Sequence, residues 1–146
     1  MEAESQMEPN GIVPAINVLV VDDNEDIRET VAVILSGSGY RCELVKNGVE
    51  AMKRVRQSRF DAVITDVEMP EMDGIALTRE LSHDFSDLPV MIMTGHSDDD
   101  YKAIALRAGA REFLSKPFDV PDLIAKLHRM LLGHNLAKEQ EAPKRA

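Results

Sequence analysis

Five polar side chains stand within two residues of the ends of short apolar runs, and their types suit the chemistry of a phosphoryl group. Asp22 and Asp23 follow one run, Asp66 ends another, and Thr94 and Lys116 follow two more. Three carboxylates brought together repel one another and need a cation, and their oxygens suit a hard ion such as Mg²⁺. A carboxylate is also a nucleophile toward phosphorus, while an ammonium and a hydroxyl can contact phosphoryl oxygens. The set predicts a metal-assisted phosphoacceptor site, provided that the fold brings the five residues together.

The apolar runs alternate with amphipathic stretches, in the order strand–helix repeated five times. Several runs are almost continuously apolar, as expected for strands buried on both faces of a parallel sheet. The five runs are Val18–Val21, Cys42–Val45, Ala62–Thr65, Val90–Met93 and Glu112–Leu114. This order predicts an α/β fold with a doubly wound, five-stranded parallel sheet and helices on both faces. Ligands of such sheets bind at the carboxyl ends of the strands, where the five polar residues are expected.

Apolar residues at helical spacing predict the core-facing side of each helix. The five stripes are Ile27, Val31, Ile34 and Leu35; Met52 and Val55; Leu77 and Leu81; Tyr101, Ile104, Ala105 and Ala108; and Val120, Leu123, Ile124, Leu127 and Leu131. Ser97 and Asp100 have the spacing of a capping box at the start of the fourth helix, which Gly109 is expected to close. Gly133 is expected to close the fifth helix in the same way.

Composition bounds the organisation of the chain. Its 146 residues are 44% hydrophobic and carry a formal net charge of −9, which indicates one globular domain and argues against direct nucleic-acid binding. We expect a flexible N-terminal arm over residues 1–15, the domain over 16–132 and a polar tail over 133–146. No apolar run reaches the length of a membrane span, and the expected location is cytoplasmic. Cys42, the single cysteine, is expected to be a small buried side chain on a strand.

Four segments of the sequence resemble the signature blocks of the receiver domain of bacterial two-component response regulators. They are VLVVDDN, VITDVEMPEMDG, VMIMTGH and REFLSKPF, and the resemblance covers residues 16–132. The intervals of 43, 28 and 22 residues that separate Asp23, Asp66, Thr94 and Lys116 also fit this family. The resemblance implies a flavodoxin-like (βα)5 fold with strand order 2-1-3-4-5 and a stand-alone receiver similar to the chemotaxis regulator.

The resemblance implies a role for each residue of the metal and phosphoryl site. Asp66 matches the phosphoacceptor. The cofactor is Mg²⁺, with Mn²⁺ as a substitute, held by Asp22, Asp23, Asp66 and the backbone carbonyl of Glu68. Thr94 and Lys116 match the pair that contacts the phosphoryl oxygens.

Three further features follow from the same resemblance. Phe113 matches the switch aromatic, although it also fits a plain core residue of a short strand. Glu68 and His96 occupy positions that tune the lifetime of the phosphate, although His96 also fits an ordinary exposed side chain. The Lys116–Pro117 peptide bond is expected to be cis.

The implied function is that of a single-domain response regulator and not of an enzyme, apart from catalysis of its own phosphorylation and dephosphorylation. The implied phosphodonor is a sensor histidine kinase or a histidine-containing phosphotransfer protein. A downstream effector protein is expected to bind the face formed by the fourth helix, fifth strand and fifth helix. The implied assembly is a monomer or a weak, phosphorylation-dependent dimer.

Three other functions stay open. The chain fits a phosphorelay shuttle, and it fits a receiver excised from a longer regulator. A phosphatase of the haloacid-dehalogenase type also uses a nucleophilic Asp, in an Asp-x-Asp-x-Thr/Val motif after its first core strand. Here the segment Asp66–Pro70 has Glu at the third place and Pro at the fifth, and it follows the third apolar run.

Overall fold

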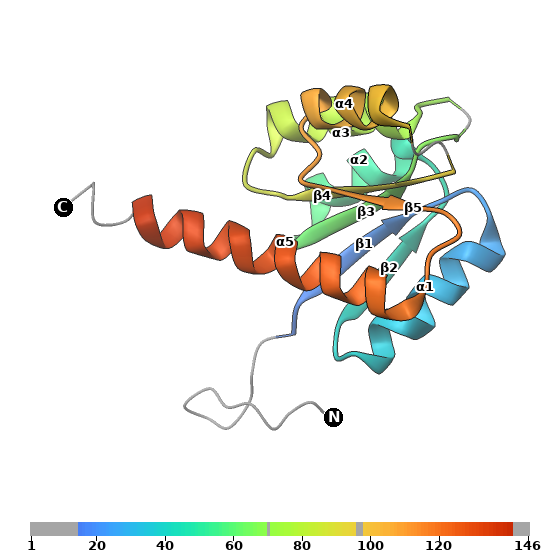
Figure 1. Cartoon of the computed structure of the whole chain (residues 1–146), viewed down its shortest axis with the longest axis horizontal. Coiled ribbons are helices and arrows are strands. Elements are labelled where there is room, and N and C mark those ends of the chain that lie inside the picture. Colours follow the sequence, from blue (N-terminus) through green and yellow to red (C-terminus); the bar gives the residue numbers. More distant parts are fainter. Residues whose placement is uncertain (1–14, 70, 96–97, 142–146) are drawn as a thin grey trace.

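The computed structural model describes residues 15–69, 71–95 and 98–141, with side chains described as far as Gly133. The expected N-terminal arm, apart from Ala15, lies outside the described residues, as do His96 and Ser97. Strands and helices alternate as the sequence predicts (Figure 1). The elements are β1 (Asn17–Val21), α1 (Glu25–Gly37), β2 (Arg41–Val45), α2 (Gly48–Gln57), β3 (Ala62–Asp66), α3 (Gly74–Asp84), β4 (Val90–Thr94), α4 (Asp99–Ala108), β5 (Glu112–Ser115) and α5 (Val120–Glu141).

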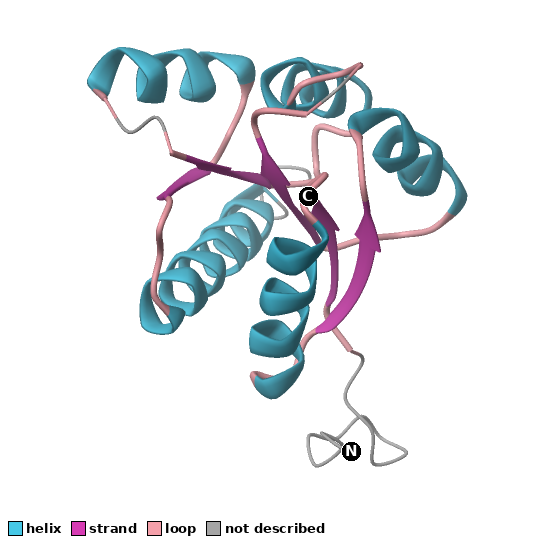
Figure 2. Ribbon diagram, turned by 90° about the vertical axis from the view of Figure 1, so that its right-hand side faces the viewer, coloured by secondary structure: helices cyan, strands magenta, loops and turns pink. Residues whose placement is uncertain are grey.

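All four strand pairs are parallel, and the strand order is β2-β1-β3-β4-β5, which confirms the flavodoxin-like fold. Figure 2 views the sheet from the carboxyl ends of its strands, with helices covering both faces. Side chains from β1, β3, β4 and β5 pack with α1 and α5 in one apolar cluster. The opposite face packs with α2, α3 and α4 in two more. The three inner strands are therefore buried on both faces, as their apolar sequences require.

Asn or Asp residues begin the helices that follow the first four strands. The side chains of Asn24, Asn47, Asp73 and Asp98 each accept a hydrogen bond from the backbone N–H three residues later. These bonds satisfy donors that the first turn of a helix leaves unpaired. The capping box expected at Ser97 is wrong, because α4 takes Asp98 as its N-cap. Gly109 closes α4 in the left-handed conformation, as expected.

The fifth helix departs from expectation at its carboxyl end. α5 continues through Gly133 to Glu141, so the prediction that Gly133 ends this helix is wrong. A glycine ends a helix by adopting a positive φ, and the described glycines with positive φ are Gly39 and Gly109. The residues that follow Gly133 include Leu, Ala, Lys, Glu and Gln, which favour helix strongly enough to offset the roughly 1 kcal/mol cost of one glycine.

Two residues of the expected core stripes are exposed. Val120, at the first position of α5, is 50% exposed, and Ile104 on α4 is 37% exposed. The neighbouring Ala105 and Ala108 are buried, because their small side chains let α4 approach the sheet closely. Among the described residues, no helix combines the length and the apolar character needed to cross a membrane.

Candidate functional site

The ends of the strands bring the expected polar residues to one edge of the sheet. Asp66 and Thr94 are the last residues of β3 and β4, while Asp22 and Lys116 directly follow β1 and β5. Backbone pairing extends past the strand ends, because the Asp22 N–H donates to the Val45 carbonyl at 3.2 Å and the Lys116 N–H to the Thr94 carbonyl at 2.7 Å. The parallel register therefore fixes these residues side by side, at the edge where doubly wound sheets bind ligands.

Three carboxylates converge at this edge. One oxygen each from Asp22, Asp23 and Asp66 lies within 4.8 Å of the others. Asp22 is fully buried, Asp66 is 8% exposed, and Asp23 is exposed at the rim. Burial raises the pKa of Asp66 above its ordinary value. The hydrogen bond from Lys116 opposes this rise, and the charge of Asp22 adds to it. Ionised carboxylates are costly to bury together, and a hard divalent cation bound between them offsets that cost. The three carboxylates therefore fit Mg²⁺.

Lys116 carries the positive charge closest to these acids. Its Nζ lies 2.9 Å from Asp66 Oδ1 and 3.2 Å from Asp22 Oδ2. Burial alone would lower the pKa of Lys116, but the hydrogen bonds and charges of Asp66 and Asp22 outweigh that effect and raise it. The side chain is therefore an ammonium across the neutral range, directed at Asp66. The Lys116–Pro117 bond is cis, which confirms that prediction.

Two contacts hold Asp22 in place. The Asn24 backbone N–H donates to Asp22 Oδ1 at 2.9 Å, and Arg28 Nη1 donates to the Asp22 carbonyl oxygen at 2.7 Å. The guanidinium of Arg28 thus fixes the backbone of the Asp22–Asp23 pair from the first turns of α1. Sequence reasoning missed Arg28; its spacing of six residues after Asp22 on the following helix is the signal that was available.

Gly74 lies against the backbone of Asp66. Its N–H donates to the Val67 carbonyl at 2.8 Å, and a Cβ at this position would lie 2.1 Å from the carbonyl oxygen of Asp66. Only glycine fits such an approach, so Gly74 sets how closely α3 packs under the loop that leaves β3. Sequence reasoning noticed this glycine only as part of a motif, because the contact depends on the path of that loop.

The remaining expected residues are placed as follows. Thr94 is buried at the end of β4, one residue after Met93, which pairs with Asp66 in the sheet. Glu68 is exposed two residues after Asp66. His96 lies outside the described residues, so its expected part in phosphate lifetime stays a prediction. Burial, and then the charges of Asp73, Glu68 and Asp66, raise the pKa of the Tyr101 hydroxyl on α4.

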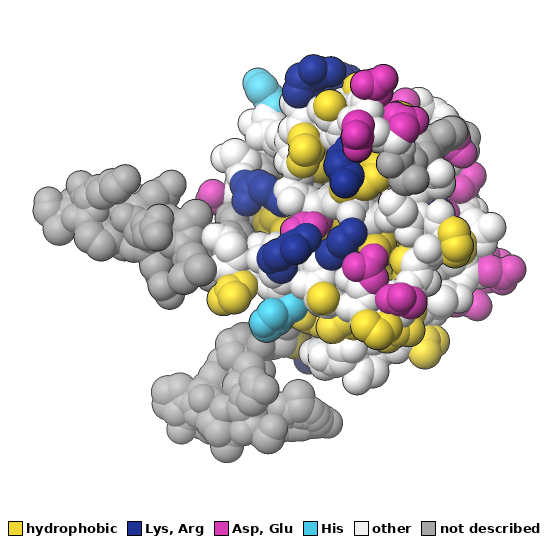
Figure 3. Space-filling model, in the orientation of Figure 1, with side chains coloured by type: hydrophobic (Ala, Val, Ile, Leu, Met, Phe, Trp, Pro, Cys, Tyr) yellow, Lys and Arg dark blue, Asp and Glu magenta, His cyan; other side chains and the backbone are white. Residues whose placement is uncertain are grey.

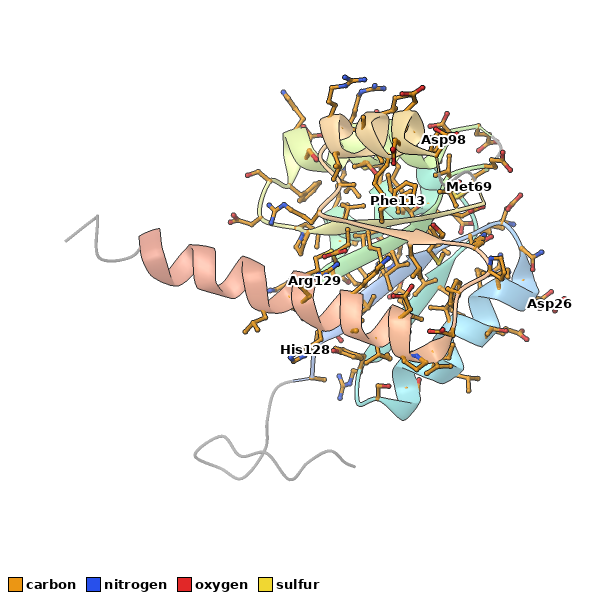
Figure 4. All side chains as sticks on the ribbon, in the orientation of Figure 1. Asp26, Met69, Asp98, Phe113, His128 and Arg129 are labelled. Carbon is orange, nitrogen blue, oxygen red and sulfur yellow. The ribbon has the colours of Figure 1, made fainter. Side chains whose placement is uncertain are left out.

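Phe113 connects β5 to two helices. The residue is 6% exposed and packs with Ala105 and Ala108 between the sheet and α4 (Figure 4). The Nζ of Lys102 lies 5.7 Å from the ring centroid, within the range of a cation–π contact. From α5, Lys126 Nζ donates to the Phe113 carbonyl at 2.9 Å. Sequence reasoning missed both lysines.

Comparisons with known proteins agree with this geometry. Residues 18–128 match the response regulator receiver domain family. The response regulator MprA of Mycobacterium sp. strain KMS is 38% identical over 116 residues, which are 80% of this chain and 50% of that protein. MprA of Mycobacterium ulcerans is 35% identical over 128 residues, 88% of this chain and 55% of that protein. The chain thus spans about half the length of these curated relatives.

Solved structures of receiver domains superpose on the chain. The chemotaxis protein CheY4 of Vibrio cholerae has a TM-score of 0.77 at 31% identity, covering 80% of this chain and 99% of that one. The signal receiver domain of a histidine kinase from Syntrophus aciditrophicus has a TM-score of 0.76 at 38% identity, covering 82% and 92%. NtrX of Brucella abortus has a TM-score of 0.82 at 32% identity, covering 88% and 30%. The family match, the parallel sheet and the three carboxylates at the strand ends all agree. The chain belongs to the response regulator receiver domain family of two-component signalling.

Proposed function

We propose that the chain is a phosphoacceptor switch in which Asp66 receives a phosphoryl group and α4, β5 and α5 pass the change to a partner protein. The observation that supports this most directly is the Lys116 ammonium, 2.9 Å from Asp66 and 3.2 Å from Asp22. Asp23 completes the set with a third carboxylate. A carboxylate nucleophile, further oxygen ligands and a point cation are the groups that phosphoryl transfer to Asp requires.

In the proposed reaction, a carboxylate oxygen of Asp66 attacks the phosphorus of a phosphohistidine on a sensor kinase or phosphotransfer protein. The O–P bond forms while the P–N bond breaks, and the imidazole nitrogen of the donor keeps the electron pair. Lys116 and the hydroxyl of Thr94 then hold phosphoryl oxygens by charge-assisted hydrogen bonds. A divalent ion held by Asp22, Asp23, Asp66 and the carbonyl of Glu68 supplies further neutralisation of phosphoryl charge when bound.

The side chains around Asp66 also bear on how long the phosphate lasts. Glu68 is exposed beside the acceptor, where its carboxylate influences the approach of water to the acyl phosphate. The same acceptance chemistry serves a stand-alone regulator, a receiver joined to an effector domain, and a shuttle that passes the group on to another histidine.

Thr94 and Phe113 carry the proposed signal away from the site. A phosphoryl oxygen gives the buried Thr94 hydroxyl a new acceptor, which draws it toward Asp66. Phe113 lies on the adjacent strand and joins α4 through Lys102 and α5 through Lys126. Phosphate shifts this equilibrium only by its differential interaction with the two states; a change from 1:99 to 99:1 needs about 5.5 kcal/mol. We therefore expect a partial shift of conformer populations.

Phosphorylation is tested by intact mass. The protein is incubated with acetyl phosphate and Mg²⁺, with a parallel sample in excess chelator. A single phosphate adduct is expected only with metal and only with Asp66 intact. An adduct that persists in Asp66→Asn, or that forms equally in chelator, contradicts the assignment.

Signal output is tested by NMR with beryllofluoride as the phosphoryl mimic. Amide shifts are expected at Asp66, along α4 and at Phe113 in the wild type. Lys116→Met is expected to keep changes near the metal site but to lose those on α4. Shift changes confined to the metal site in the wild type would refute the proposed path through Thr94 and Phe113.

A further inference from the structure

Thr65 is a polar residue inside the central, apolar strand β3. It is 0% exposed, and every residue of this strand is buried. In the sheet it lies between Val21 of β1 and Ile92 of β4, which belong to the apolar clusters that pack with α2, α3 and α4. A hydroxyl buried among apolar side chains is costly unless it has a hydrogen-bond partner. The partner of this hydroxyl therefore indicates what the threonine does.

That partner is the backbone carbonyl of the proposed phosphoacceptor. The Thr65 hydroxyl donates to the Asp66 carbonyl oxygen, with 2.8 Å between the two oxygens. Successive side chains of a strand point to opposite faces of the sheet. Asp66 accordingly pairs with Met93, which belongs to the apolar cluster of the other face. The Thr65 hydroxyl thus acts on Asp66 through its backbone and not through its carboxylate.

The peptide group between Asp66 and Val67 transmits this contact to the carboxylate. The N–H of this group belongs to Val67, and it donates to the Asp66 carboxylate. A trans peptide group is planar, so its C=O and N–H point in opposite directions and turn together. A hydrogen bond that fixes the C=O therefore also fixes the N–H. By this coupling, Thr65 orients a donor that holds the Asp66 carboxylate.

Gly74 lies against the same carbonyl oxygen. A Cβ at Gly74 would stand 2.1 Å from the Asp66 oxygen, so the glycine Cα lies next to it. The Gly74 N–H also donates to the next carbonyl, that of Val67, at 2.8 Å. Thr65 and Gly74 thus hold two successive peptide groups after Asp66. The carboxylate that these groups position lies with its Oδ1 2.9 Å from Lys116 Nζ.

Thr65 lies away from the surface where a phosphodonor approaches. On the face shown in Figure 3, Asp and Glu side chains gather toward the right-hand side, where the strand arrows of Figure 1 point. That edge contains Asp22, Asp23 and Asp66, with one oxygen of each within 4.8 Å of the others. Because Thr65 is 0% exposed, its effect on a reaction at this edge must pass through Asp66.

We propose that Thr65 is a positioning residue for phosphoryl transfer, which orients the Asp66 carboxylate through the Asp66–Val67 peptide group. This inference rests on the proposed function, because it assigns how the acceptor of that reaction is held. Positioning of the reacting groups supplies much of the catalysis of phosphoryl transfer. Valine in place of Thr65 keeps the branched shape but removes the donor. The peptide group can then rotate, and the carboxylate leaves its attacking geometry more often.

Thr78 provides a matched control. It is also 0% exposed, and its hydroxyl donates to a backbone carbonyl, that of Gly74, at 2.7 Å. This bond spans one turn of α3, which is an ordinary contact for a threonine inside a helix. Thr78→Val therefore removes the same chemical group from an equally buried position but leaves the donor to the Asp66 carbonyl in place. Thr65→Ser is the conservative variant, because serine retains the hydroxyl.

The first measurement is the rate of phosphorylation by acetyl phosphate, followed by intact mass over a range of Mg²⁺ concentrations. Thr65→Val is expected to lower the rate at saturating Mg²⁺ by about tenfold, because the nucleophile is misplaced. The Mg²⁺ concentration that gives half of this rate is expected to change by less than about threefold, since Asp22 and Asp23 are untouched. Thr78→Val and Thr65→Ser are expected to stay within about threefold of the wild-type rate. Circular dichroism verifies that each variant is folded at the assay temperature.

The second measurement needs neither a phosphodonor nor a metal ion. Hydrogen exchange of the Val67 amide is followed by NMR in EDTA at neutral pH. The wild type is expected to protect this N–H, because it donates to the Asp66 carboxylate. Thr65→Val is expected to speed its exchange by about tenfold, whereas Thr78→Val is expected to leave it unchanged.

Two outcomes overturn the proposal. One is a Thr65→Val protein that matches the wild type in both the phosphorylation rate and the exchange of the Val67 amide. The other is an equal loss of rate in Thr65→Val and Thr78→Val, which would show a general effect of buried hydroxyl groups. A wild type that takes up no phosphate, with faster Val67 exchange in Thr65→Val, would overturn the proposed function and the catalytic part of this inference. The orientation of the peptide group by Thr65 would then still be supported.

Discussion

Replacement of Gly74 by alanine places a methyl group where the carbonyl oxygen of Asp66 already lies. The added Cβ would stand 2.1 Å from that oxygen and 2.9 Å from the Cα of Val67, and real Cβ atoms do not approach within 3.0 Å. Both neighbours are backbone atoms, so no side chain can rotate away. The backbone of Asp66 or the first turn of α3 must therefore move by about 1 Å.

This displacement has two measurable costs. Overpacking against backbone costs about 1–3 kcal/mol, which at roughly 3–6 °C per kcal/mol lowers the melting temperature by about 10 °C. A shift of about 1 Å in the carbonyl of Asp66 also misplaces the nucleophile, and misplacement of that size can cost about 100-fold in rate. Phosphorylation is therefore expected to fall by more than the loss of stability explains.

The assays are thermal unfolding by circular dichroism and the rate of phosphorylation by acetyl phosphate, both with Mg²⁺ and well below the melting temperature. Gly133→Ala is the control, because a Cβ there meets no atom within 4 Å. That variant is expected to gain about 0.5–1 kcal/mol, since alanine favours helix over glycine, and to keep the wild-type rate. A Gly74→Ala protein with unchanged melting temperature and rate would refute the proposed close approach.

Further predictions concern titratable groups and the core. Burial raises the pKa of Asp66 above its unfolded value, so the carboxyl group stabilises the fold only at low pH, and this contribution is lost as the pH rises through the folded-state pKa. In EDTA at pH 7, Asp66→Asn should therefore melt at a higher temperature than the wild type. An equal or lower melting temperature would contradict this prediction. Burial raises the pKa of the Cys42 thiol to about 11, so iodoacetamide at pH 8 should alkylate it slowly in the native protein and rapidly in urea; equal rates would show a freely accessible thiolate. Leu127→Ala removes a fully buried side chain of α5 and should cost about 2–5 kcal/mol in urea unfolding, whereas the exposed Leu132→Ala should cost little.

The alternation of apolar runs and amphipathic stretches was enough to predict the class of fold and the edge that carries the site. Parallel strands joined by helices must all end at one edge, so Asp22, Asp66, Thr94 and Lys116 were bound to lie along that edge, whereas their distances depend on the order of the strands. Which strands are neighbours was a different matter, since periodicity carries no information on pairing. The order β2-β1-β3-β4-β5 was available from the family resemblance and not from the pattern itself.

Local helix signals were only partly reliable, because they compete with one another. Gly109 ends α4 as its neighbours suggest, yet Gly133 lies inside α5. A glycine ends a helix only where the residues after it are more stable outside the helix than within it. After Gly133 the sequence favours helix, and that preference over several residues exceeds the cost of one glycine.

Contacts between segments distant in the sequence were decided by the tertiary structure alone. Arg28 reaches the Asp22 carbonyl, Gly74 lies under Asp66, and Lys102 covers the Phe113 ring because helices pack at particular heights and rotations over the sheet. The sequence pattern indicates which residues share a face of one helix or strand. The distance between residues of different elements depends on how the side chains between them pack.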